Sequence, residues 1–155
     1  MRRAPWLPFA ALAAALAGCA GSEMPPHSGK TVIQNPVCNG LPAERWLVGE
    51  WGNPNTQVAF RMAGENITWT YNRDAGVMSE RWGLKQPARG DGSVRRINGC
   101  AIEMGGFYSS HGGTRRAVGT PLDFWMTYDG SQRLAGTGLG FGKEKFEIFW
   151  LKREK

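Results

Sequence analysis

The chain has 155 residues and a formal net charge of +6, with 19 Lys and Arg against 13 Asp and Glu. This length corresponds to a single domain. Its basic residues are scattered and no nucleic-acid-binding motif is present, so the sequence argues against nucleic acid as a partner. A modest positive charge is better suited to anionic lipid, polysaccharide or an acidic partner.

Residues 1–18 have the pattern of a secretory signal peptide. Arg2 and Arg3 precede an apolar run at 7–17, and small residues follow it. The run is too short for a transmembrane helix, which needs about 20 apolar residues. Removing residues 1–18 from the 155 leaves 137, and because Arg2 and Arg3 are the charges lost, the net charge falls from +6 to +4.

The signal ends in Leu16-Ala17-Gly18-Cys19, which resembles the lipobox of bacterial lipoproteins. The resemblance implies cleavage before Cys19 and acylation of that residue, palmitate included, so that several chains hold the protein on a membrane. Ala20, rather than Asp, follows the cysteine, which by the same resemblance implies the outer membrane. We expect the periplasmic face, although the sequence does not distinguish it from the cell surface. The alternative is an ordinary signal peptide with an incidental cysteine.

A tether and one folded domain are expected after the signal. Residues 19–37 comprise the lipidated cysteine and a stretch rich in Gly, Ser and Pro, which disfavours regular structure. The domain is expected to span 38–155. It contains Cys38 and Cys100, an even pair in an exported protein, which predicts a disulfide.

The sequence predicts neither a metal site nor a cofactor. The two histidines, His27 and His111, are far apart along the chain, and no CxxC or HxH motif is present. The glycine-rich stretch 136–143 lacks the spacing of a phosphate-binding loop. Its alternate glycines instead favour a tight bend or close packing under a large aromatic side chain.

Apolar and polar residues alternate through most of the presumed domain, which is the pattern of half-buried strands. Short turn signals separate these segments, so consecutive strands are expected to pair antiparallel. The strands with the clearest alternation are 58–62, 66–71, 100–104, 122–128 and 146–151, and the turn signals are Ala63-Gly64, Asp74-Ala75-Gly76, Asn98-Gly99 and Asp129-Gly130. The predicted fold is all-β, an antiparallel up-and-down meander closing into a small barrel of about eight strands, with one helical turn near 41–46.

Gly49-Glu50-Trp51 at the start of the first barrel strand resembles the opening motif of the calycins, the lipocalin and avidin-like barrels. The resemblance implies that Trp51 closes one end of the barrel against a basic residue of the last strand, a part that Lys152 or Arg153 could take. The motif covers only three residues. No biotin-binding set can be transferred, and the other lipocalin motifs are not evident.

Aromatic residues give two functional hypotheses. Five inward-facing rings either line a pocket for a small apolar ligand or envelope component, as in a periplasmic binding module, or simply fill the core. These are Trp51, Trp69, Tyr71, Phe124 and Trp150.

The alternative is an anchored protein-interaction or inhibitor module with a solid barrel. Trp125 and Phe149 fall on the outward face of their strands and could form an apolar patch for a partner. An enzyme is not expected. Ser109, Ser110 and His111 are catalytic residue types, but nothing in their spacing makes them a catalytic set.

Overall fold

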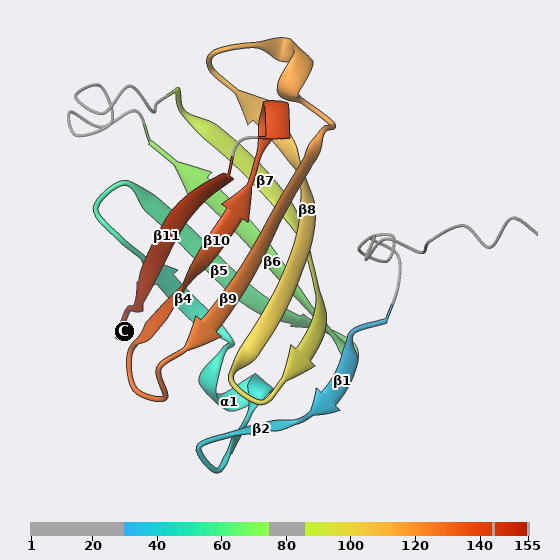
Figure 1. Cartoon of the computed structure of the whole chain (residues 1–155), viewed down its shortest axis with the longest axis vertical. Coiled ribbons are helices and arrows are strands. Elements are labelled where there is room, and N and C mark those ends of the chain that lie inside the picture. Colours follow the sequence, from blue (N-terminus) through green and yellow to red (C-terminus); the bar gives the residue numbers. More distant parts are fainter. Residues whose placement is uncertain (1–29, 75–85, 144, 155) are drawn as a thin grey trace, which may run out of the picture.

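The computed structural model describes residues 30–74, 86–143 and 145–154. Its central feature is a closed barrel of eight antiparallel strands plus one extra strand, which confirms the predicted fold class (Figure 1). The barrel strands are β4 (Gly49–Gly52), β5 (Thr56–Ala63), β6 (Asn66–Arg73), β7 (Ala88–Asn98), β8 (Ala101–His111), β9 (Pro121–Tyr128), β10 (Arg133–Leu139) and β11 (Lys145–Lys152). The other elements are β1 (Val32–Asn35), β2 (Val37–Cys38), β3 (Leu41–Pro42), α1 (Ala43–Trp46), η1 (Arg115–Ala117) and η2 (Phe141–Lys143).

Each barrel strand pairs with its neighbours in chain order, and the last strand returns to the first. Closure occurs where β11 pairs with β4, with Leu151 opposite Gly52 and Lys152 opposite Trp51. The alternation that predicted β9 is present in its burial, since Phe124 is buried and Trp125 is exposed. A closed barrel of this kind has no unpaired edge among its own strands.

Two hairpin turns lie one residue later than the sequence signals suggested. Ala63 pairs with Asn66 and Asn98 pairs with Ala101, so each loop has two residues and begins with glycine. Gly64 has a φ of 64° and Gly99 a φ of 61°, whereas the second loop residue is not in the left-handed region. This is the type II′ pattern, in which only the first central residue needs positive φ. The expected Asp74-Ala75-Gly76 turn lies partly outside the described residues.

The loop between β9 and β10 is organised by one carboxylate. Asp129 Oδ1 accepts hydrogen bonds from the backbone N–H groups of Ser131 at 2.8 Å, Gln132 at 3.0 Å and Arg133 at 3.0 Å. The backbone bond from Arg133, followed by that from Ser131, lowers the pKa of Asp129 from 3.8 to about 2. The turn predicted at Asp129-Gly130 is therefore a longer loop, and Gly130, with a φ of 88°, takes its left-handed position.

The segment before β4 crosses one end of the barrel. A disulfide joins Cys38 of β2 to Cys100 in the β7–β8 turn, as predicted, with the two Cα atoms 4.8 Å apart. β1 pairs in parallel with the end of β7, with Val32 opposite Arg96. This strand extends the sheet into the segment 19–37 that the sequence suggested was a tether.

Aromatic packing closes the same end of the barrel. The ring of Trp46, from the expected helical turn α1, stacks on Tyr128 with centroids 4.7 Å apart, and Trp51 meets Tyr128 edge-on at 5.8 Å. Lys152 Nζ lies 5.6 Å from the Trp51 ring centroid and donates a hydrogen bond to the Trp46 carbonyl at 2.7 Å. The contact between Trp51 and a basic residue of the last strand, expected from the sequence motif, is thus present.

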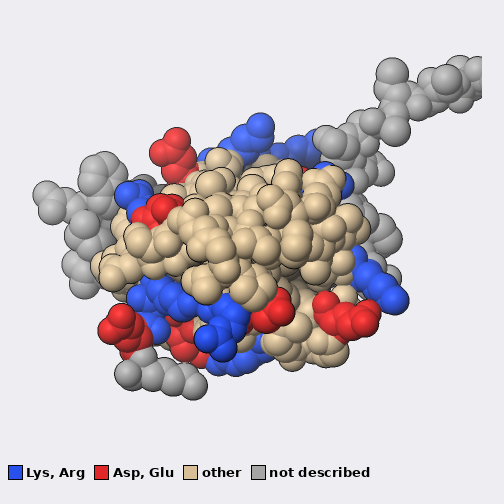
Figure 2. Space-filling model, turned by 90° about the horizontal axis from the view of Figure 1, so that it is seen from below, with Lys and Arg blue, Asp and Glu red and all other residues tan. Residues whose placement is uncertain are grey.

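Seen from this end, the centre of the surface is uncharged, and Lys, Arg, Asp and Glu of both signs lie around its margin (Figure 2). The segment that crosses this end, residues 31–43, contains no charged residue. The end therefore does not present a charged patch of a single sign.

Candidate functional site

The inward aromatic residues pack against one another inside the barrel. Phe124 lies at the centre of this cluster, with its ring centroid 5.2 Å from that of Trp150, 5.4 Å from Tyr71 and 5.7 Å from Trp69. Trp51, the fifth predicted ligand residue, contacts Tyr128 nearer the closed end. All five side chains are at most 3% exposed. The structure therefore brings four of the five predicted residues into one cluster in which the rings contact each other.

Hydrogen bonds within the protein satisfy the polar atoms of the three tryptophans. Trp69 Nε1 donates to the Ser93 carbonyl at 3.1 Å, and Trp150 Nε1 donates to Thr56 Oγ1 at 3.0 Å. The indole nitrogen of Trp51 donates to the carbonyl of Leu47 at 2.8 Å. None of these indole N–H groups is left to orient a ligand, which is how buried tryptophans behave in a core.

Glycines allow these rings to fit. A Cβ added at Gly106 would overlap the Trp69 ring, and one added at Gly138 would overlap the Phe146 ring. The stretch 136–143 thus packs under a large aromatic side chain, as its alternate glycines predicted. Burial raises the pKa of Tyr71 to about 12, which keeps its phenol neutral among these rings. These contacts give the described interior the character of a packed core.

The outer face of the barrel carries the two predicted partner residues. Trp125 on β9 is 41% exposed and Phe149 on β11 is 38% exposed. Both flank β10, where Thr137 is opposite Trp125 and Ala135 is opposite Phe149. Small side chains on β10 therefore lie between the two aromatic side chains, so the surface between these two side chains is recessed.

Among the described residues, two separate surface depressions adjoin these aromatic residues. One, of about 560 Å³, lies over β10 and β11 and includes Arg133, Glu147 and Phe149. The other, of about 290 Å³, lies across β1, β7, β8 and β9 and includes Trp125. Trp125 and Phe149 thus share one face of the barrel but line different depressions, whereas the sequence suggested a single patch.

Charged and polar residues of these depressions were not singled out from the sequence. Arg133 places its guanidinium 4.7 Å from the Phe149 ring centroid, which is a cation–π contact. Arg96 and Glu103 form an ion pair with 3.4 Å between Nη1 and Oε1. Strand register, which the sequence does not specify, decides which of these side chains become neighbours.

Of the catalytic residue types at the end of β8, His111 makes the contacts of a structural residue. His111 Nδ1 accepts a hydrogen bond from the Gly113 N–H at 3.1 Å, and its ring lies 5.5 Å from Tyr108 and 6.3 Å from Phe141. Burial, and then the positive charge of Arg73, lowers the pKa of His111. These contacts use the imidazole in the packing and hydrogen bonding of its own loop.

Comparison with known proteins gave no match: no family model, curated protein or solved structure matches the chain. Within residues 30–74, 86–143 and 145–154, no helix is long and apolar enough to cross a membrane. In the same residues, no group of three or more His, Cys, Asp and Glu side chains is arranged to hold a metal ion. Cys19, the predicted lipidation site, lies outside the described residues.

Proposed function

We propose that this protein is a lipid-anchored interaction module on the periplasmic face of a bacterial outer membrane, with a solid barrel that binds an envelope protein through its outer face. The packed interior is the main support. Phe124, Tyr71, Trp69 and Trp150 contact one another at ring distances of 5.2 to 6.4 Å. A small apolar ligand inside the barrel, the other hypothesis, has less support because these four rings contact one another there.

The depression over β10 and β11 is the best candidate for the partner surface. Phe149 in this depression is 38% exposed. Leu151, two residues further along β11 and opposite Arg133, is 45% exposed. Glu147 lies beside Thr137 on the same face. Exposed apolar side chains bordered by charges of both signs are typical of a protein interface, with an apolar centre and a polar rim.

A photo-crosslinker placed at Phe149 is expected to join the protein to one discrete envelope partner in cells. The same crosslinker at Met62, which is 47% exposed on β5, is the matched control. Phe149→Ala should reduce recovery of that partner by affinity purification and lower the free energy of unfolding by about 1 kcal/mol at most, the scale of a side-chain change on a strand. Identical adducts from positions 149 and 62, or undiminished recovery with Phe149→Ala, would contradict the proposal.

Lipid anchoring rests on Leu16-Ala17-Gly18-Cys19 alone and has its own test. Cells producing the full chain are expected to incorporate radiolabelled palmitate into it, and Cys19→Ser should abolish the label and release the protein from the membrane fraction. Cys38→Ser is the matched control and should remain labelled, because Cys38 is bonded to Cys100. Persistent labelling of Cys19→Ser would overturn the anchor.

A further inference from the structure

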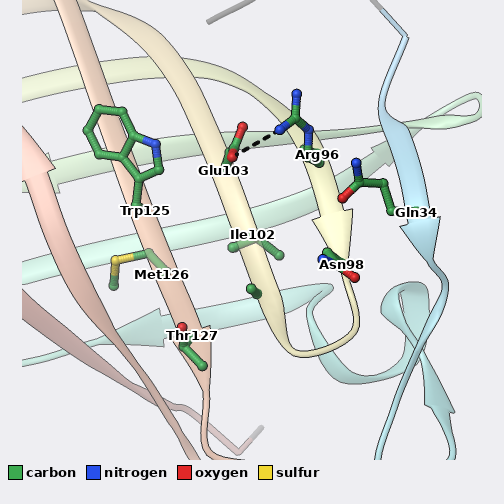
Figure 3. A pocket seen from close by; sticks show the side chains of 9 residues that line it. Gln34, Arg96, Asn98, Ile102, Glu103, Trp125, Met126 and Thr127 are labelled. Atoms are coloured by element: carbon green, nitrogen blue, oxygen red, sulfur yellow. Dashed lines mark hydrogen bonds and ion pairs between the residues drawn. The ribbon is translucent and has the colours of Figure 1, made fainter. Parts of the chain in front are cut away.

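Polar side chains line the depression beside Trp125 and are arranged in rows (Figure 3). Strand register places Arg96, Glu103 and Trp125 in one row across β7, β8 and β9. Asn98, Ala101 and Thr127 form the next row. Since the middle position of this second row is only an alanine, the surface dips between the larger side chains on either side.

β1 adds a further wall. The pairing of β1 with β7 shifts register between Ile33 and Asn35, and Gln34 at this irregularity lines the depression. Figure 3 shows Gln34 and Asn98 on the side opposite Trp125. The Trp125 indole and the two amides thus lie on opposite sides of a depression of about 290 Å³.

The charge within this depression sums to zero. Arg96 and Glu103 form an ion pair at 3.4 Å, and the side chains of Gln34, Asn98 and Thr127 are neutral. A ligand carrying net charge would therefore meet one attractive and one repulsive group at close range. The geometry favours a neutral ligand.

The side chains at this site offer many hydrogen-bond donors and many hydrogen-bond acceptors. The two amides each offer donors and an acceptor, the Thr127 hydroxyl offers both, and Glu103 accepts. Arg96 Nε is buried without a hydrogen-bond partner among the described residues. A ligand that supplies many hydroxyls can satisfy both donors and acceptors.

We infer that this depression is a binding site for a neutral saccharide. Trp125, exposed at 41%, offers an aromatic surface on which the C–H face of a pyranose ring packs, while the amides of Gln34 and Asn98 on the opposite side contact the sugar hydroxyls. This site adjoins the proposed protein surface but does not depend on it, since Phe149 lines only the other depression.

Binding of neutral oligosaccharides to the full chain, measured by calorimetry, tests this assignment. The probes are trimers of N-acetylglucosamine, glucose and galactose, with fully deacetylated, cationic glucosamine trimer and trigalacturonate as charged comparators. At least one neutral trimer should bind saturably and better than either charged one. Trp125→Ala and Asn98→Ala should each weaken it about tenfold, as loss of a central contact does, and Trp125→Phe should retain part of the affinity.

Phe149→Ala is the matched control, because it removes an outward aromatic side chain of the same face outside this depression. It should leave saccharide affinity unchanged even where it abolishes protein capture, so the two proposals can fail separately. The saccharide site is refuted if no neutral trimer binds saturably. Equal affinity in Trp125→Ala and the parent chain, or preference for a charged trimer, also refutes it.

Discussion

Trp150→Ala is expected to lower the free energy of unfolding by about 3–5 kcal/mol, the cost of removing a large ring from a packed core. Trp150 is 0% exposed, its ring lies 5.2 Å from Phe124, and its Nε1 donates to Thr56. The substitution leaves a cavity and also removes the hydrogen-bond partner of a buried hydroxyl, which adds to the loss. Urea denaturation followed by far-ultraviolet circular dichroism measures it.

Trp125→Ala is the matched control because it makes the same chemical change on the outer face, where the ring is 41% exposed. Its unfolding free energy should fall by about 1 kcal/mol, the scale of a side-chain change on the solvent face of a strand. A loss in Trp150→Ala no larger than in Trp125→Ala would mean that the interior is not packed as described. The argument for a solid barrel would then lose its support.

Removing the disulfide with Cys38→Ser and Cys100→Ser together is expected to cost about 2–4 kcal/mol, chiefly by freeing the unfolded chain. The two cysteines are 62 positions apart in the sequence, and their bond ties the segment that crosses the barrel end to the β7–β8 turn. The double variant avoids leaving one free thiol. Denaturation of the parent chain with and without a reductant provides the second measurement.

Reduction and double substitution should lower stability by similar amounts, and the reductant should have no effect on the double variant. If the parent chain keeps its stability on reduction, the bond does not constrain the unfolded state as described. The barrel strands themselves should still form, because β4 to β11 pair without the bonded segment.

Strand periodicity and turn residues were sufficient to predict the barrel class. The alternation in 122–128 correctly placed Phe124 inside and Trp125 outside, because side chains in a strand point to opposite faces in turn. The sequence did not predict β1, because this strand pairs in parallel with β7, which is distant from it in the sequence. Local sequence patterns do not indicate such long-range pairing. The turns shifted by one residue because glycine occupies the first loop position of a type II′ turn.

The candidate surface could be predicted only in part. Exposure of Trp125 and Phe149 follows from alternation, but their separation by β10 into two depressions depends on register. The Arg96–Glu103 pair likewise depends on a register shift in β7 between Val94 and Arg96, where the strand gains one residue. Sequence alone gives no indication of such a bulge.

Fluorine NMR of the protein labelled with 5-fluorotryptophan tests most directly whether binding uses the outer face or the interior. Three probes are titrated in turn, namely solubilised envelope from the producing cells, the neutral trimers, and laurate as an apolar molecule. Trp-to-Phe variants assign the signals. The account predicts that a neutral trimer moves the Trp125 signal, while the signals of Trp69 and Trp150 stay fixed with every probe. Movement of Trp69 and Trp150 with laurate or envelope, with Trp125 unchanged, would contradict it.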